Sequence, residues 1–145
     1  MILRKNKLEN GRQIGPYGGN RMIIGSYIYI PVKDLEKAAG WYEKNLEFNL
    51  VYKDTLYFDM RTANWIKIML ITRENNITSQ MEYSTGQQPA YGFCVDDFDA
   101  VREKLEVNGV KIGDEFDYFG RSFSFYDLDG NKIEIWEDYD YIISK

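Results

Sequence analysis

The feature that most constrains the fold is a similarity between the two halves of the chain. Residues of similar type recur at a constant separation of 63 positions, where Val32, Asp34 and Leu35 match Val95, Asp97 and Phe98. Both sets stand where a β-branched and aromatic stretch changes to a helical pattern of apolar residues. A repeat of this kind predicts a duplicated supersecondary unit.

Each half reads as a strand, a helix and three further strands. In the first half we expect a helix over 33–48 and strands at 23–32, 49–53, 56–61 and 65–72. In the second half we expect a helix over 96–109 and strands at 89–95, 111–117, 121–126 and 132–137. Asp34 and Asp97 are expected to cap the two helices. The predicted fold class is α+β, with two tandem βαβββ modules (about 22–72 and 89–138) that form curved mixed sheets around a cleft. Each sheet then has one helix, so its other face is covered by the twin module or left as a cavity.

The chain length of 145 residues suits one domain, which we place at 22–145. Residues 1–21 differ in kind, because they hold five basic residues against one acid and show no periodicity. We expect them to form a flexible tail, and Met22 is a hypothetical natural start. The polar segment 73–89 is predicted to be a linker between the modules.

Composition excludes several classes of function. The net charge is −5, and no cluster of Lys and Arg is interleaved with exposed aromatic residues, so nucleic acid is not an expected partner. No apolar run approaches the length of a membrane span, and the N-terminus lacks the apolar core of a secretory signal. We therefore expect a cytoplasmic protein without a membrane partner. The single cysteine, Cys94, lies in an apolar stretch where a buried, inert thiol is expected.

The chain contains no histidine. A conventional Ser-His or Cys-His catalytic pair is therefore excluded, and the commonest ligand for zinc, iron and nickel is missing. The segment DLDGN (127–131) lacks the further ligands of a calcium loop and is predicted to be a hairpin turn.

Two segments resemble a known family. IPVKDLEKAAGWYEKNLEFNLVY (30–52) looks like the opening strand, helix and strand of the vicinal oxygen chelate superfamily, and SFYDLDGNKIEIWE (124–137) looks like its closing hairpin. That superfamily includes glyoxalase I, bleomycin-resistance proteins, fosfomycin-resistance enzymes and extradiol dioxygenases. The resemblance spans residues 23–138. It implies paired modules around a ligand cleft, and often a homodimer.

In metal-using members the metal ligands come from the first strand of each module and from the last strand. The matching positions here are Tyr27, Ala90 and Glu134, of which Glu134 alone keeps a usual ligand type. One carboxylate cannot supply the three protein ligands of a typical catalytic metal site. We therefore expect no catalytic metal and no cofactor. At Glu47, after the first helix, the family usually has glycine.

The resemblance points Glu134 into the cleft, and strand alternation then suggests which other side chains share it. The candidate ligand-binding residues are Tyr27, Tyr29, Tyr57, Trp65, Met69, Cys94, Arg121, Glu134 and Trp136. They would form a slot with aromatic walls and one carboxylate, suited to a flat or cationic molecule. In the alternative interpretation Glu134 faces solvent or pairs with Lys132 or Arg121, and the aromatic rings only pack.

The favoured hypothesis is a small-molecule binding protein of the glyoxalase/bleomycin-resistance type, which sequesters an organic ligand without a metal and contributes to antibiotic resistance. A second hypothesis is a metal-independent lyase or isomerase in which Glu134 is the general base and Tyr27 polarises the substrate. A third is a regulatory module whose cleft is filled by its own side chains.

Overall fold

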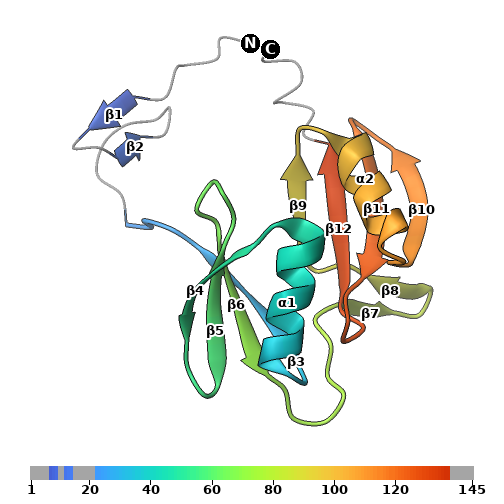
Figure 1. The fold of residues 1–145 in the computed structure, drawn as a ribbon. Helices are drawn as coiled ribbons and strands as arrows, with labels where there is room; N and C mark the ends of the chain where they lie inside the picture. Colours follow the sequence, from blue (N-terminus) through green and yellow to red (C-terminus); the bar gives the residue numbers. More distant parts are fainter. Residues whose placement is uncertain (1–6, 10–11, 15–21, 138–145) are drawn as a thin grey trace.

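The computed structural model describes residues 7–9, 12–14 and 22–137, and Figure 1 shows their arrangement. Two short strands, β1 (Lys7–Glu9) and β2 (Arg12–Ile14), pair antiparallel. The rest of the predicted tail lies outside the described residues, so a flexible tail and a start at Met22 stay predictions. Among the described residues, no helix has both the length and the apolar character needed to cross a membrane.

The first module is a βαβββ unit. Its elements are β3 (Tyr27–Val32), α1 (Leu35–Leu46), β4 (Asn49–Lys53), β5 (Tyr57–Arg61) and β6 (Lys67–Thr72). The strand order in the sheet is β3-β6-β5-β4, with β3 parallel to β6 and the other neighbours antiparallel. The first strand of the module thus lies at the edge of the sheet, beside the last.

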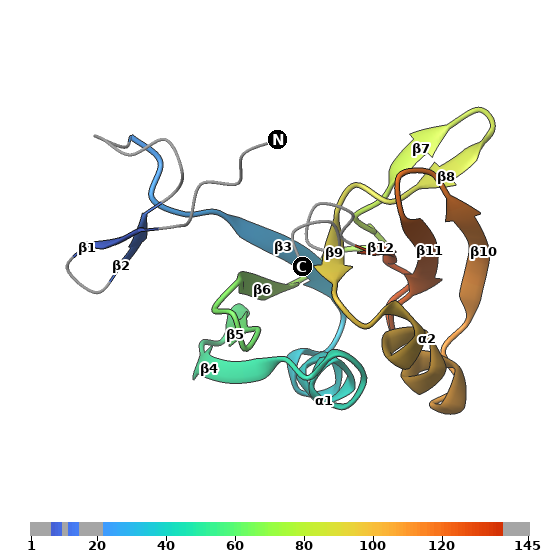
Figure 2. The ribbon, with the colours of Figure 1, turned by 90° about the horizontal axis from the view of Figure 1, so that it is seen from above.

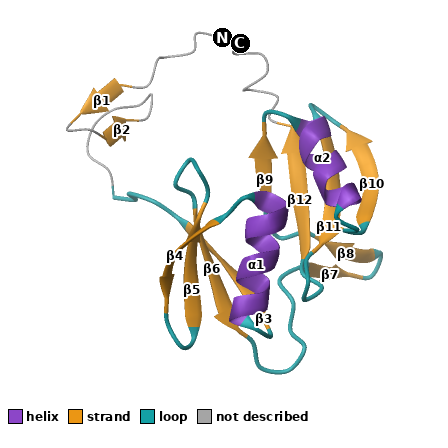
Figure 3. Cartoon of the chain, in the orientation of Figure 1, coloured by secondary structure: helices purple, strands orange, loops and turns teal. Residues whose placement is uncertain are grey.

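The second module repeats this plan. Its elements are β9 (Gly92–Val95), α2 (Phe98–Val107), β10 (Ile112–Asp117), β11 (Arg121–Tyr126) and β12 (Lys132–Glu137). The strand order is β10-β11-β12-β9, and β9 is again an edge strand parallel to the last strand. Figure 3 shows one helix in front of each sheet. The predicted α+β class and the tandem βαβββ modules are confirmed.

The two helices begin in the same way. The carboxylates of Asp34 and Asp97 accept hydrogen bonds from the backbone N–H groups of Lys37 (3.0 Å) and Ala100 (3.1 Å). Each bond satisfies one of the free donors at a helix N-terminus. The predicted N-caps are therefore confirmed at both positions of the repeat.

Equivalent residues of the two modules meet directly. The side-chain amide of Asn108 donates to Asn45 Oδ1 at 3.0 Å, and these residues are separated by the same 63 positions as the sequence repeat. An approximate two-fold axis therefore passes between them, where α1 meets α2. The buried apolar residues of both modules form one core, which includes Ile30, Tyr42, Phe58, Leu70, Phe98, Leu105, Phe125 and Ile135.

The DLDGN turn between β11 and β12 is joined to the first module by hydrogen bonds. The Asp127 carboxylate, 7% exposed, accepts hydrogen bonds from the Tyr42 hydroxyl at 2.5 Å and from the backbone and side-chain N–H groups of Asn131, at 2.8 Å each. Asn131 is fully buried and also donates to the carbonyl oxygen of Pro31 at 2.9 Å. Because Tyr42 and Pro31 belong to the first module, this hairpin turn is also the module junction.

Burial changes the acidity of the groups at this junction. Loss of solvent raises the pKa of Asp127, although its hydrogen bonds from Tyr42 and Asn131 act in the opposite direction. Burial, followed by the nearby Asp127 charge, raises the pKa of Tyr42 well above its ordinary value. The Tyr42 hydroxyl therefore stays protonated as a donor over the physiological pH range.

Three local expectations differ from the structure. The segment 73–89 is not a plain linker, because β7 (Met81–Tyr83) and β8 (Gly86–Gln88) form an antiparallel hairpin within it. The first strand begins at Tyr27 rather than at residue 23. Trp65 lies in a turn with φ of 64°, before β6 begins at Lys67, because Thr62 accepts bonds from the backbone N–H groups of Trp65 and Ile66.

Candidate functional site

Each sheet has one face covered by helix and one open face. Figure 2 shows both helices on the same side of the two sheets. Strand alternation places Ile30, Met60 and Leu70 toward the helix in the first sheet, and all three are fully buried. The intervening side chains lie on the open face. Seven predicted site residues lie on the open faces of the strands, namely Tyr27, Tyr29, Tyr57, Met69, Cys94, Glu134 and Trp136.

The open face of the first sheet is aromatic at the β3 edge. The rings of Tyr27 and Tyr29 meet edge to face at 5.1 Å, and the two side chains are 58% and 48% exposed. Tyr29 pairs in register with Met69 of β6, which pairs in turn with Asp59 of β5. Tyr57 lies further along β5 and contacts Tyr52, with ring centroids 6.1 Å apart.

Charged groups occupy the centre of the same face. The Asp59 carboxylate pairs with Arg61 at 3.0 Å and with Lys67 at 3.7 Å. The Arg61 guanidinium also lies 5.2 Å from the ring centre of Trp65. Trp65 is thus held beside the open face by a cation–π contact from the turn rather than by strand alternation.

Glu134 lies on the open face of the second sheet between two very small neighbours. Its cross-strand partners are Ser124 on β11 and Gly92 on β9. A Cβ atom at Gly92 would lie only 2.4 Å from the carbonyl oxygen of Glu134, so β9 approaches this closely because residue 92 is glycine. The Glu134 carboxylate therefore has no large cross-strand neighbour on either side.

Trp136 and Cys94 are in register on the same sheet, next to Glu134 and Gly92. The Cys94 side chain is exposed, so the expectation of a buried thiol was wrong. The reason is that Cys94 shares the open face of the sheet with its register partner Trp136 and lies on an edge strand, β9.

Among the described residues, no ion pair or hydrogen bond engages the Glu134 carboxylate. The two suggested partners are occupied elsewhere, since the Lys132 ammonium donates to the Gln87 carbonyl at 2.8 Å. Arg121 binds Asp99 at 2.9 Å and Glu137 at 3.2 Å, and its guanidinium lies 4.6 Å from the ring centre of Phe98 on the helix side. These contacts to Arg121 lower the pKa of Glu137. Arg121 therefore lies on the opposite face from Glu134.

The β7–β8 hairpin, which the sequence analysis did not predict, bonds to one end of the second sheet's open face. In addition to the Lys132 bond, the Tyr126 hydroxyl donates to Gln87 Oε1 at 3.3 Å. Tyr126 and Lys132 are register partners where β11 ends and β12 begins, at one end of the open face. The signal that could have identified this hairpin is the Ser84-Thr85-Gly86 turn, where Gly86 has φ of 133°.

The residues do not fit the metal site of metal-using relatives. At the family positions stand a phenol, a methyl group and one carboxylate, from Tyr27, Ala90 and Glu134. No group of three or more His, Cys, Asp or Glu side chains within the described ranges could hold an ion. A divalent metal needs more oxygen or nitrogen ligands than this arrangement supplies.

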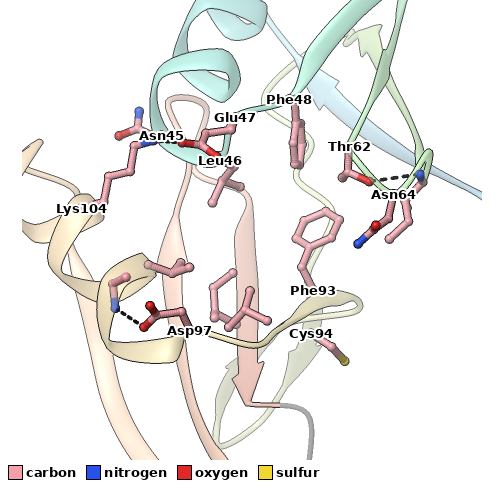
Figure 4. Close-up of a pocket in the computed structure, with 15 residues that line it drawn as sticks. Asn45, Leu46, Glu47, Phe48, Thr62, Asn64, Phe93, Cys94, Asp97 and Lys104 are labelled. Carbon is pink, nitrogen blue, oxygen red and sulfur yellow. Dashed lines mark hydrogen bonds and ion pairs between the residues drawn. The ribbon is translucent and has the colours of Figure 1, made fainter. Parts of the chain in front are cut away.

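A separate pocket of about 300 Å³ lies between the modules on the helix side of the sheets (Figure 4). The end of α1, the 62–66 turn, β9 and α2 surround it. Cys94 is the one predicted site residue among those that line it.

Comparisons with known proteins agree with the geometry. The model of the glyoxalase/bleomycin resistance protein/dioxygenase superfamily matches residues 23–135, and the chain belongs to this superfamily. A search of curated proteins found no significant match.

Solved structures show the same fold. An integron cassette protein from the mobile metagenome of the Halifax Harbour sewage outfall is 19% identical, with a TM-score of 0.64 over 78% of this chain and 97% of that one. The fosfomycin resistance protein FosX from Listeria monocytogenes is 24% identical, with a TM-score of 0.64 over 80% and 94%. The same FosX complexed with Mn(II) and sulfate is also 24% identical, with a TM-score of 0.62 over 80% of this chain and 91% of that one.

Proposed function

We propose that this protein binds a flat, cationic organic molecule on the open sheet faces and sequesters it without a catalytic metal, as a cytoplasmic resistance protein would. The observation that carries the proposal is the half-buried Glu134 carboxylate, which has no partner among the described residues and whose cross-strand neighbours, Ser124 and Gly92, are both small. A partly desolvated carboxylate binds a cation more strongly than an exposed one does. Trp136, Tyr27 and Tyr29 supply aromatic surface for stacking.

The charge of the protein supports a cationic ligand. The chain carries a net charge of −5, which attracts cations over long range. On the first sheet the Asp59 carboxylate is already paired with two cations, Arg61 and Lys67, so it is not free to bind a ligand cation. Glu134 is therefore the carboxylate best placed to supply an unpaired negative charge to a ligand.

We also propose a homodimer. β3 and β9 are both edge strands, so each presents unpaired backbone groups. In the segment that precedes β3, the apolar residues Met22, Ile23 and Ile24 are at least 81% exposed. Exposed apolar residues next in the chain to an edge strand favour pairing with a second copy. Sedimentation velocity should show a dimer, and a monomer at 100 µM, about the upper range of such experiments, would contradict it.

Proflavine, a planar aromatic cation, tests the ligand class. Its fluorescence anisotropy should rise on titration with the protein, and Glu134→Gln should weaken binding about tenfold, as expected for loss of a charge-assisted contact. Glu103→Gln, an exposed charge on α2, is the matched control and should leave the affinity unchanged. Equal affinity of the Glu134→Gln and Glu103→Gln proteins would refute the role of Glu134.

The same carboxylate favours one alternative, a metal-independent lyase or isomerase with Glu134 as general base. The unpaired state of Glu134 leaves its oxygens available to accept a proton from a substrate. In that case Glu134→Gln abolishes turnover and retains ligand binding. Loss of binding in the same variant supports sequestration instead.

A further inference from the structure

We infer that the pocket between the modules is a second ligand site, which binds a neutral, largely apolar molecule of one or two rings. It is independent of the Glu134 face, because residues 93, 95 and 135 point from their strands toward the helices, whereas Glu134 and Trp136 point to the opposite side. The strands β9 and β12 thus separate the two sites.

Contacts between the modules hold the pocket open. Phe48 and Phe93 come from different modules and meet edge to face at 5.4 Å, which makes one wall (Figure 4). The Asn45–Asn108 bond and the Lys104–Glu47 ion pair (3.0 Å) join the modules next to it. A pocket bounded by such contacts exists before a ligand arrives, so binding costs little reorganisation.

The volume defines the size of the ligand. Apolar cavities of roughly 150 Å³ accept a benzene ring. The pocket measures about 300 Å³, which is room for one or two rings. Its inner wall is apolar and consists of Leu46, Phe48, Phe93, Val95, Val101 and Ile135.

The polar groups at the rim favour a neutral ligand. Two carboxylates, Glu47 and Asp97, stand there against one ammonium, Lys104, so an organic anion is repelled. The charges are also already engaged, because Asp97 caps α2 and Lys104 pairs with Glu47. An added cation would have to lose its hydration beside an apolar wall without gaining an unpaired partner.

Asn64 supplies one hydrogen-bonding group. Within the described ranges no hydrogen bond engages its side-chain amide, and Figure 4 shows this amide pointing from the 62–66 turn toward Phe93. An amide can donate and accept, so it suits a ligand with a single hydroxyl or N–H group. The expected ligand therefore places an apolar ring against Phe48 and Phe93 and its polar atom at Asn64.

Three probes with the same ring system test this chemistry. Indole is neutral, indole-3-acetate is anionic and tryptamine is cationic. Each is titrated into the ¹⁵N-labelled full chain, and amide chemical shifts report both the site and the affinity. Indole should shift the amides of Leu46, Phe93 and Val101, and should bind at least fivefold more tightly than either charged analogue. Shifts elsewhere, or equal binding of the three probes, would overturn the proposal.

Two pairs of variants locate the site. Val101→Phe fills the pocket and should abolish indole binding, whereas Val107→Phe makes the same change at a 78% exposed position of α2 and should not. Asn64→Ala should weaken indole binding about fivefold, the value of one hydrogen bond. Glu134→Gln should leave it unchanged, so failure of this inference is distinguishable from failure of the proposed function. Undiminished indole binding to a folded Val101→Phe protein would contradict the inference.

Discussion

The hydrogen bond from Tyr42 to Asp127 gives the sharpest prediction for stability. Tyr42→Phe removes the hydroxyl that donates to the buried carboxylate at 2.5 Å and leaves the ring, which stacks on Phe48 at 5.2 Å. Hydrogen bonds to charged groups contribute roughly 1.5–3 kcal/mol. Asp127 keeps its three other bonds, from the Asp129 and Asn131 backbone and from the Asn131 side chain, so we expect a loss of about 2 kcal/mol, near the lower part of this range.

Urea unfolding followed by tryptophan fluorescence measures this loss. A change of about 2 kcal/mol alters the folding equilibrium roughly 30-fold and lowers Tm by about 4–8 °C for a domain of this size. Tyr52→Phe deletes the same hydroxyl at a 54% exposed position and should change the stability by less than about 0.5 kcal/mol. If the two variants were equally stable, the junction would not depend on the Tyr42 bond.

The pH dependence gives a second measure of the same bond. The folded state holds the Tyr42 proton beyond the ordinary pKa of 10.0, so this contribution is complete below pH 10 and is lost as the pH rises above it. The gap in unfolding free energy between wild type and Tyr42→Phe should narrow by up to about 1.4 kcal/mol for each pH unit above 10. A gap that stays constant to pH 11.5, about one and a half units higher, would contradict the reasoning.

Three further changes have expected outcomes. Glu47→Gly should stabilise the protein by about 0.5–1 kcal/mol in thermal unfolding, because Glu47 has φ of 56°, a conformation that glycine adopts without strain. The exposed ion pair with Lys104 that this change removes contributes little, and a destabilised protein would argue against this reasoning. Gly92→Ala should destabilise the folded protein by about 1–3 kcal/mol, because the new Cβ meets the backbone of Glu134. If this variant were as stable as the wild type, β9 would be able to shift away from β12 at little cost. Gly40→Ala, in the exposed middle of α1 with nothing within 4 Å of the new Cβ, should instead stabilise by about 0.5–1 kcal/mol; if both alanines had the same effect, local space would not be the cause.

Much of the fold follows from sequence pattern alone. The repeat of 63 positions predicted the two modules, and it also relates Asn45 to Asn108, which bond across the axis. Asp34 and Asp97 identified both helix starts, because a capping carboxylate acts through neighbours close in sequence. Alternation along β3 and β12 separated the buried residues from those on the open faces, because strand periodicity depends only on the backbone.

Other features depend on distant contacts, which sequence pattern does not contain. Cys94 is exposed because it lies on an uncovered sheet face at an edge strand, and which face and which edge stay uncovered is a property of the whole sheet. Asp127 and Asn131 of the DLDGN turn are buried because they bond to Tyr42 and Pro31, which lie 85 and 100 residues away from them in the sequence. The pocket between the modules arises in the same way, from the meeting of Phe48 with Phe93.

A crystal structure grown with both Mn(II) and proflavine tests the proposed binding site most directly. We expect the planar ring against Tyr27, Tyr29 or Trp136, with its charge beside Glu134, and no ion within roughly 2.0–2.2 Å of the carboxylate, the usual coordination distance. An Mn(II) ion coordinated by Glu134 and several other oxygens, with proflavine absent from the open faces, would contradict it.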